Sequence, residues 1–164
     1  MSVAAVCPGS FDPITMGHLD IVRRAADEFD RLVVAVLDNP RKTASAMFSA
    51  TERMDLIRET VSDLPGVEVD SFSGLLVDFC RDKGITVVCK GLRAVSDFEY
   101  ELQMAQMNQR IGDVETLFMS TSPEYSYLSS SLIKEVAKGG GSIAGTVPDN
   151  VEKAMRRRLE ESAP

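Results

Sequence analysis

Residues 3–18 of the chain read VAAVCPGSFDPITMGH, an apolar stretch that passes through a Gly/Pro/Ser turn into the start of an amphipathic helix. This order predicts a buried strand, a tight turn and a helix. The first backbone N–H groups of such a helix have no partners within it, and together with the helix dipole they favour a bound anion. The stretch therefore indicates a phosphate site.

His18 is the only histidine of the chain and lies at the start of this predicted helix. A side chain that can be a cation near neutral pH suits charge that grows on a phosphate during a reaction. The alternative is a capping or packing role, because junctions of this kind also occur in α/β proteins that bind nothing there. The other loops of the chain bear on this choice.

Short runs of apolar, β-branched residues recur along the chain, and each is too short for a helix. They predict strands at 3–7, 32–37, 67–69, 85–89 and 116–119. Helical patterns lie between them, with Ser-x-x-Glu capping boxes at Ser49–Glu52 and Ser96–Glu99. Further helices are expected at 75–83 before Gly84, after Ser131 with a glycine stop at 139–141, and at the end of the chain with Pro148 in the first turn.

This alternation of strands and helices predicts an α/β fold for a single domain spanning residues 1–164. Strands that are apolar on both sides indicate a Rossmann-like, doubly wound, five-stranded parallel sheet with helices on both faces. Ligands then bind at the carboxyl ends of the strands. The loops expected at that edge are 8–17, 38–48, 71–74, 90–96 and 120–131.

Composition excludes several classes of function. A net charge of −7 argues against a broad nucleic-acid surface, and the Arg156–Arg158 run is interpreted as a solvated helix face or a subunit contact. The three cysteines lack CxxC spacing, so with one histidine no zinc site is expected. No apolar stretch approaches the roughly 20 residues that span a bilayer. These features favour a soluble, cytoplasmic protein with no membrane partner.

Positive side chains are concentrated in the loops at the predicted carboxyl edge. Lys42 lies in the second loop, Lys90 and Arg93 lie in the fourth, and three consecutive serines end the fifth at 129–131. In an acidic chain this grouping favours two or more phosphoryl groups held together. Taken singly, Lys42 could be plain surface, Arg93 an ion-pair partner of Asp97 or Glu99, and the serines an ordinary helix cap.

Several motifs together resemble the phosphopantetheine adenylyltransferases, a family of the nucleotidylyltransferase superfamily marked by a T/HxGH turn. They are PGSFDPITMGH at 8–18, Lys42, KGLR at 90–93, DFEYE at 97–101, and YSYLSSS at 125–131 followed by LIKEV at 132–136. The TxGH turn alone indicates only the superfamily, whereas the combination is specific to the family. The similarity covers nearly the whole chain.

The resemblance implies transfer of the adenylyl group of ATP to 4′-phosphopantetheine, which gives dephospho-coenzyme A and pyrophosphate, with Mg2+ on the triphosphate. It also implies a cytoplasmic homohexamer under feedback from coenzyme A. The implied catalytic residues are His18, Lys42 and Arg93, and the implied acceptor-binding residues are Ser10, Lys42, Leu76 and Lys90. The implied ATP-binding residues are Ser10, Phe11, His18, Gly91, Leu92, Arg93, Glu101, Tyr125, Ser126, Tyr127, Leu128, Ser129, Ser130 and Ser131.

The chain departs from the family pattern at two of these positions. Ser10 stands where many members have threonine, and Lys90 stands where many have arginine. The hydroxyl and the charge are kept, but a lysine cannot hold a phosphate with the two-pronged geometry of an arginine.

The attacking group in such a reaction is a phosphate oxygen that is already anionic, so no general base is needed. The loops contain no evident carboxylate–histidine or serine–histidine pair. The expected task is to align two anions and to neutralise the charge on the α-phosphorus and the leaving pyrophosphate. His18, Lys42, Lys90, Arg93 and the metal are expected to supply that charge.

Other functions fit parts of the pattern. A nucleotidylyltransferase acting on nicotinamide mononucleotide, or on an alcohol phosphate with CTP, usually has histidine where Thr15 stands. A nucleotide sensor or a flavodoxin-like electron carrier would share the sheet. A catalytic fragment of a class I aminoacyl-tRNA synthetase would need RNA contacts that an acidic chain disfavours. Separately, Leu102, Met104 and Met107 are expected in the core, with a subunit contact as the alternative.

Overall fold

The structure is a computed structural model that describes residues 3–162, apart from the side chains of residues 42–44 and 95–96. Within these residues, five strands form one parallel sheet in the order β3-β2-β1-β4-β5. Their bounds are β1 Ala4–Gly9, β2 Arg31–Leu37, β3 Val67–Phe72, β4 Val87–Leu92 and β5 Glu115–Ser120. The predicted five-stranded, Rossmann-like parallel sheet is confirmed.

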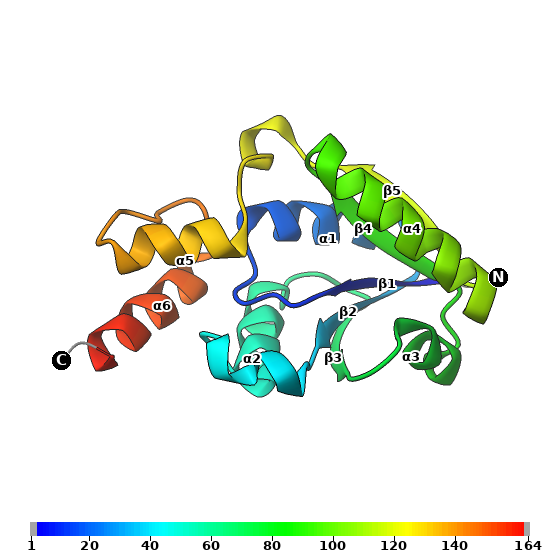
Figure 1. Ribbon diagram of the computed structural model, residues 1–164, viewed down its shortest axis with the longest axis horizontal. Helices are drawn as coiled ribbons and strands as arrows, with labels where there is room; N and C mark the ends of the chain where they lie inside the picture. The colour runs from blue at the N-terminus through cyan, green and yellow to red at the C-terminus, as the bar shows by residue number, and fades with distance from the viewer. Residues whose placement is uncertain (1–2, 163–164) are drawn as a thin grey trace.

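Helices connect the strands and cover both faces of the sheet (Figure 1). Alternate residues of β1 separate the two layers: Ala5 and Cys7 pack with α1 and α2, whereas Val6 packs with α3 on the opposite face. The doubly wound arrangement is therefore confirmed. The helices are α1 Met16–Glu28, η1 Pro40–Ser45, α2 Ala50–Thr60, α3 Leu76–Lys83, α4 Val95–Gly112, η2 Pro123–Tyr125, α5 Ser130–Lys138 and α6 Asp149–Glu161.

The local start and stop signals are confirmed at most helix ends. The Ser49–Glu52 capping box is present, and Gly84 ends α3 in the left-handed conformation that glycine adopts freely. The Ser96–Glu99 capping box is wrong, because α4 already begins at Val95 and Ala94 is its N-cap residue. Pro148 is likewise the residue before α6 and does not lie in its first turn.

The strand ends also differ from the prediction, and the difference concerns the site. Residues 90–92, expected in a loop, continue β4, because Lys90 pairs with Phe118 and Leu92 with Ser120 on β5. Pro8 and Gly9 likewise continue β1, in register with β2. The polar groups at this edge therefore start from the ends of paired strands, whose backbone positions are fixed by neighbouring strands.

The last two helices lie side by side at the end of the molecule away from the amino terminus (Figure 1). Their buried residues, such as Ile133 of α5 and Met155 of α6, belong to the same core as α1 and α2. Among the described residues, no helix has both the length and the apolar character needed to cross a membrane.

Candidate active site

The phosphate turn, residues 9–18, ends in a reciprocal capping arrangement. Thr15 is the N-cap residue of α1, and its hydroxyl accepts the backbone N–H of His18 at 3.2 Å. In return, Nδ1 of His18 accepts the backbone N–H of Thr15 at 3.0 Å. Because Nδ1 is an acceptor in this bond, the proton of the neutral ring lies on Nε2. The capping role and the chemical role of His18 are thus compatible, since each uses a different nitrogen.

The charge of His18 differs from the sequence-based expectation. Burial in the cavity wall, with a further contribution from the positive charges of Arg93 and Lys90, lowers the pKa of His18 to about 4. The ring of the free protein is therefore neutral at pH 7, and the expectation of a cation is wrong for this state. In this state the second ring nitrogen of His18 is an N–H donor, and the positive charge next to it belongs to Arg93 and Lys90.

Phe11 shapes the turn next to this ring. Its backbone adopts a positive φ of 47°, in the left-handed region that bulky residues avoid. Its own ring covers Gly9, where an added Cβ would lie 3.1 Å from the ring atoms, and meets the His18 ring edge-on at 5.2 Å between centroids. Gly9 is therefore needed for close packing, and Phe11 fixes one side of His18.

A cavity of about 360 Å³ opens beside His18 at the carboxyl ends of β1 and β4. It is large enough for a small-molecule ligand. The expected ATP-binding residues that line it are Phe11, His18, Gly91, Arg93, Glu101, Tyr125, Leu128, Ser129, Ser130 and Ser131. Leu92, Ser126 and Tyr127 do not line it, and Ser10 lies outside it as well.

A second cavity of about 350 Å³ adjoins the first. Ser10, Leu76 and Lys90, the expected acceptor-binding residues with described side chains, all line it. The side chain of Lys42 lies outside the described residues. The two cavities share Pro8, Gly9, Lys90 and Glu101 in their walls. Groups predicted to hold two different substrates thus line adjoining hollows.

Ion pairs hold the cationic side chains of this region. Lys90 Nζ lies 3.4 Å from Glu101 Oε2 at the shared wall. Arg93 donates from Nη1 to the carbonyl of Leu128 at 2.7 Å and pairs through Nε with Asp97 at 3.2 Å. The ion pair of Arg93 with Asp97, one of the two alternatives for this residue, is therefore present. Arg93 still lines the first cavity, and its hydrogen bond to Leu128 connects it to the segment before α5.

The serine run also lines the first cavity. Ser129 is the N-cap residue of α5 and accepts the backbone N–H of Leu132 at 3.1 Å. Ser130 donates its hydroxyl to the carbonyl of Pro13 at 2.8 Å. The helix-cap interpretation is thus correct for Ser129, while Ser130 ties the start of α5 to the phosphate turn. Two helix starts, those of α1 and α5, border the same cavity.

Sequence reasoning missed other residues that line the cavities. Asp97 and Thr121 line the first, and Tyr100 and Asn108 line the second. Asp97 and Tyr100 lie within the DFEYE motif, which signalled the region but not their side-chain positions. Cys7 and Cys89 line the first cavity from neighbouring strands as buried thiols. No pattern in the sequence distinguished them from core residues.

Comparison with known proteins identifies the family of the chain. Residues 6–136 match the model of the Cytidylyltransferase-like family, so the chain is a nucleotidyltransferase. A phosphopantetheine adenylyltransferase of Frankia casuarinae is 59% identical over 161 residues, covering 96% of this chain and 98% of the relative. One from Frankia alni is 60% identical with the same coverage, and one from Streptomyces coelicolor is 57% identical over 94% of this chain and 96% of the relative. The chain belongs to the phosphopantetheine adenylyltransferase family.

Proposed function

We propose that the chain performs the reaction of its family, adenylyl transfer from ATP to 4′-phosphopantetheine, by direct in-line attack of the acceptor phosphate on the α-phosphorus of ATP. The products are dephospho-coenzyme A and pyrophosphate. The observation that carries the proposal is the wall that the two cavities share at Pro8, Gly9, Lys90 and Glu101. ATP in the first cavity and the acceptor in the second meet at the carboxyl ends of β1 and β4.

The reaction needs no general base in this site. The acceptor oxygen already carries negative charge, and the bond from this oxygen to the α-phosphorus forms as the bond to pyrophosphate breaks. His18 has its Nδ1 engaged by Thr15, and its remaining nitrogen bears a proton. The ring would therefore donate a hydrogen bond to a phosphate oxygen, and it would take no proton from the attacking phosphate.

His18, Lys42 and Arg93 are assigned the catalytic roles. The Nε2–H of His18 would stabilise charge on the α-phosphate, and a preorganised donor contributes more to the transition state than a solvent molecule does. Arg93 would hold the leaving phosphates next to the serine run. Lys42 would neutralise the acceptor phosphate, and Lys90 in the shared wall would attract both substrates.

Mg2+ is expected to enter with the phosphates of ATP. Of the carboxylates that line the first cavity, Asp97 is paired with Arg93 and Glu101 with Lys90. In the described part of the chain no group of three or more side chains is arranged to hold a metal ion. This donor set suits Mg2+ coordinated by substrate phosphates and water. When bound, the ion would neutralise charge on the triphosphate.

The oligomer is proposed to form through α4 and β5. The core expectation for this helix is wrong, because Leu102, Met104 and Met107 are exposed, with 54% exposure at Met107. Ile111 of the same helix is exposed as well, and Leu117 is an exposed apolar residue of β5. A second copy of the chain is the proposed occupant, in a hexamer. Coenzyme A is proposed as a feedback inhibitor, because it carries both the adenylyl group assigned to the first cavity and the pantetheine arm assigned to the second.

The reaction is tested by measuring pyrophosphate release from ATP and Mg2+ in separate reactions with 4′-phosphopantetheine, nicotinamide mononucleotide, an alcohol phosphate, and no acceptor. CTP replaces ATP in a parallel series. We expect release only with ATP and 4′-phosphopantetheine, with dephospho-coenzyme A identified by mass spectrometry. Release without any acceptor, or with another acceptor at a comparable rate, would contradict the proposal.

A further inference from the structure

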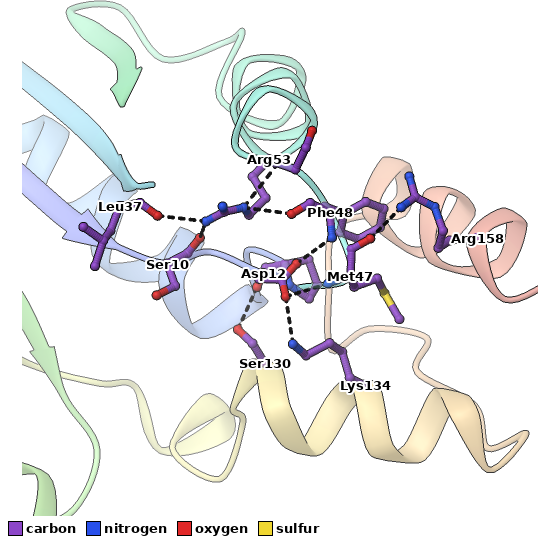
Figure 2. A network of polar contacts seen from close by, with 11 residues as sticks. Ser10, Asp12, Leu37, Met47, Phe48, Arg53, Ser130, Lys134 and Arg158 are labelled. Carbon is purple, nitrogen blue, oxygen red and sulfur yellow. Dashed lines mark hydrogen bonds and ion pairs between the residues drawn. The ribbon is translucent and has the colours of Figure 1, made fainter. Parts of the chain in front are cut away.

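A buried polar network joins three parts of the candidate site that lie far apart in the sequence (Figure 2). At its centre is Asp12, which is 8% exposed and belongs to the phosphate turn. Its Oδ1 accepts the backbone N–H of Phe48 at 2.9 Å, and its Oδ2 accepts that of Met47 at 2.9 Å. Lys134 of α5 also donates to Oδ2 from Nζ at 2.8 Å. One carboxylate thus holds the turn, the segment before α2 and the helix that follows the serine run.

Arg53 closes the same connection from the other side. This buried guanidinium donates from Nη1 to the carbonyl of Ser10 at 2.6 Å and to that of Leu37 at 3.1 Å. Its Nε donates to the carbonyl of Phe48 at 3.2 Å. Leu37 and Phe48 flank residues 38–47, the segment that contains Lys42. We call this segment the acceptor loop. Arg53 therefore holds both ends of the acceptor loop against Ser10.

The carboxyl-terminal helix completes the network. Arg158 of α6 donates to the carbonyl of Met47 at 2.7 Å and pairs with Glu52. Its guanidinium also lies over the ring of Phe48. The peptide groups of Met47 and Phe48 therefore have all their N–H and C=O groups bound by Asp12, Arg53 and Arg158. Arg158 was expected on a solvated helix face or at a subunit contact. The solvated face is wrong for this residue, because it packs against the end of the acceptor loop within the same chain.

None of these charged groups faces the two cavities, since Asp12, Arg53 and Lys134 are absent from their linings. The hydrogen bonds and ion pair described above join these charged groups to other parts of the protein. Burying ionised groups is costly unless their charges are compensated by ion pairs or hydrogen bonds. Asp12 and Lys134 pair with each other, and Arg53 donates to the backbone carbonyls of Ser10, Leu37 and Phe48. If the ion pair of Asp12 and Lys134 only held the phosphate turn against α5, apolar side chains could do the same. This network joins Ser10, which lines the second cavity, to α5, whose first turn lines the first cavity, and this connection points to another role.

Resting on the proposed function, we propose that Asp12, Lys134 and Arg53 are positioning residues that fix the distance between the acceptor phosphate and the triphosphate of ATP. Asp12 and Arg53 hold the acceptor loop against Ser10, and Lys134 holds α5, whose first turn borders the ATP cavity, against the same carboxylate. In-line attack requires both phosphates to be aligned, and a misplacement of about 1 Å can cost roughly a hundredfold in rate.

The central variant is Lys134→Met, which removes the link to α5 but leaves both backbone bonds of Asp12 in place. We expect kcat at saturating ATP and acceptor to fall about 10- to 100-fold. The Kd for ATP with Mg2+, measured by calorimetry without acceptor, should change by less than about threefold. Lys134→Arg keeps the charge and should recover most of the rate. Lys138→Met, at an exposed position of the same helix, is the matched control and should behave as the wild type.

A double-mutant cycle with Asp12→Asn tests whether the pair acts as a unit. An amide offers one acceptor oxygen in place of two and turns N–H groups toward Lys134. If the pair acts together, the double variant has a kcat no lower than that of Asp12→Asn alone. If the fold loss of kcat in the double variant equals the product of the two single losses, the residues act independently, which contradicts the proposal. If Asp12→Asn does not fold, the Lys134 and Lys138 variants still decide the matter.

Several results would overturn the proposal. These are a Lys134→Met enzyme with wild-type kcat, a loss confined to thermal stability, a loss that Lys138→Met shares, or an ATP affinity that falls in parallel with kcat. A failure of the proposed function is recognised separately, because the wild-type enzyme itself would then release no pyrophosphate with 4′-phosphopantetheine.

Discussion

Lys90 and Glu101 form an ion pair in the wall between the two cavities, with 3.4 Å between Nζ and Oε2. Lys90 is held in position by the pairing of β4 with β5, and Glu101 extends from α4. Each side chain is partly exposed, so the ammonium group remains accessible to phosphates from either side. This lysine is the one cation, among side chains the structure describes, that lines both cavities.

We expect Lys90→Ala to raise the KM of ATP and the KM of the acceptor by roughly tenfold each, because the unpaired Glu101 carboxylate would then repel both phosphates. Lys90→Arg should keep both values within about threefold, since the charge remains. Steady-state kinetics with each substrate varied in turn measures both constants. A rise in only one KM would assign Lys90 to a single substrate.

The His18→Ala variant should lower kcat by roughly 10² to 10³, the usual effect of removing one preorganised donor, while the affinity for ATP weakens much less. The physical reason is that, in the proposed mechanism, the Nε2–H stabilises charge that develops mainly in the transition state. Rapid-quench measurement on saturated enzyme and calorimetry with ATP separate the two quantities. An unchanged turnover with a large loss of ATP affinity would show that His18 binds the ground state instead.

Stability of the ligand-free protein should fall as the pH drops from about 6.5 to about 4. The pKa of His18 is lower in the folded state than in the unfolded chain, so the unfolded chain binds the proton first as the pH falls. Full stability is therefore present above about 6.5, and the loss contributed by His18 reaches at most about 3 kcal/mol at about pH 4. Urea unfolding across this range measures it. His18→Gln should show a shallower dependence, and equal slopes for both proteins would disprove the shift.

Gly9→Ala should reduce kcat/KM for ATP by about tenfold, because the added methyl group would displace the ring of Phe11. The new methyl group would lie 3.1 Å from the Phe11 ring, which is buried and rests against His18. Gly139→Ala is the matched control, because the nearest atoms to its added Cβ are at 3.5 Å and its φ is negative. Comparable losses in the two variants would mean that the ring of Phe11 is unimportant.

The α4 surface gives a test of assembly. Met107→Lys places a charge on the proposed subunit contact and should shift the particle mass, measured by light scattering after gel filtration, from hexamer toward smaller species. Val136→Lys, at an exposed apolar position on α5, should leave the mass unchanged. A wild-type protein that is monomeric at micromolar concentration would refute the contact directly.

Local sequence signals predicted much of this molecule. The apolar runs located the central strands, and the Ser49–Glu52 pattern gave the start of α2, because a capping box needs only residues within one turn. The extension of β4 through Lys90 was missed, since the end of a strand depends on a partner such as Phe118. The charge of His18 was also missed, because burial and the distant residues Arg93 and Lys90 determine it. The partners of Asp12, up to 122 residues away, have no local signature at all.

The shared wall at Pro8 and Gly9 has a consequence for the end of the catalytic cycle. In the proposed reaction, each cavity first holds a separate substrate that can dissociate alone. After the reaction, the product is one covalent molecule that occupies both cavities. While one half is bound, it keeps the other half at a high effective concentration next to its own cavity. Pyrophosphate, anchored on one side only, should therefore leave first. Dephospho-coenzyme A has to break its contacts in both cavities before it dissociates. We therefore expect its release to be the rate-limiting step of turnover.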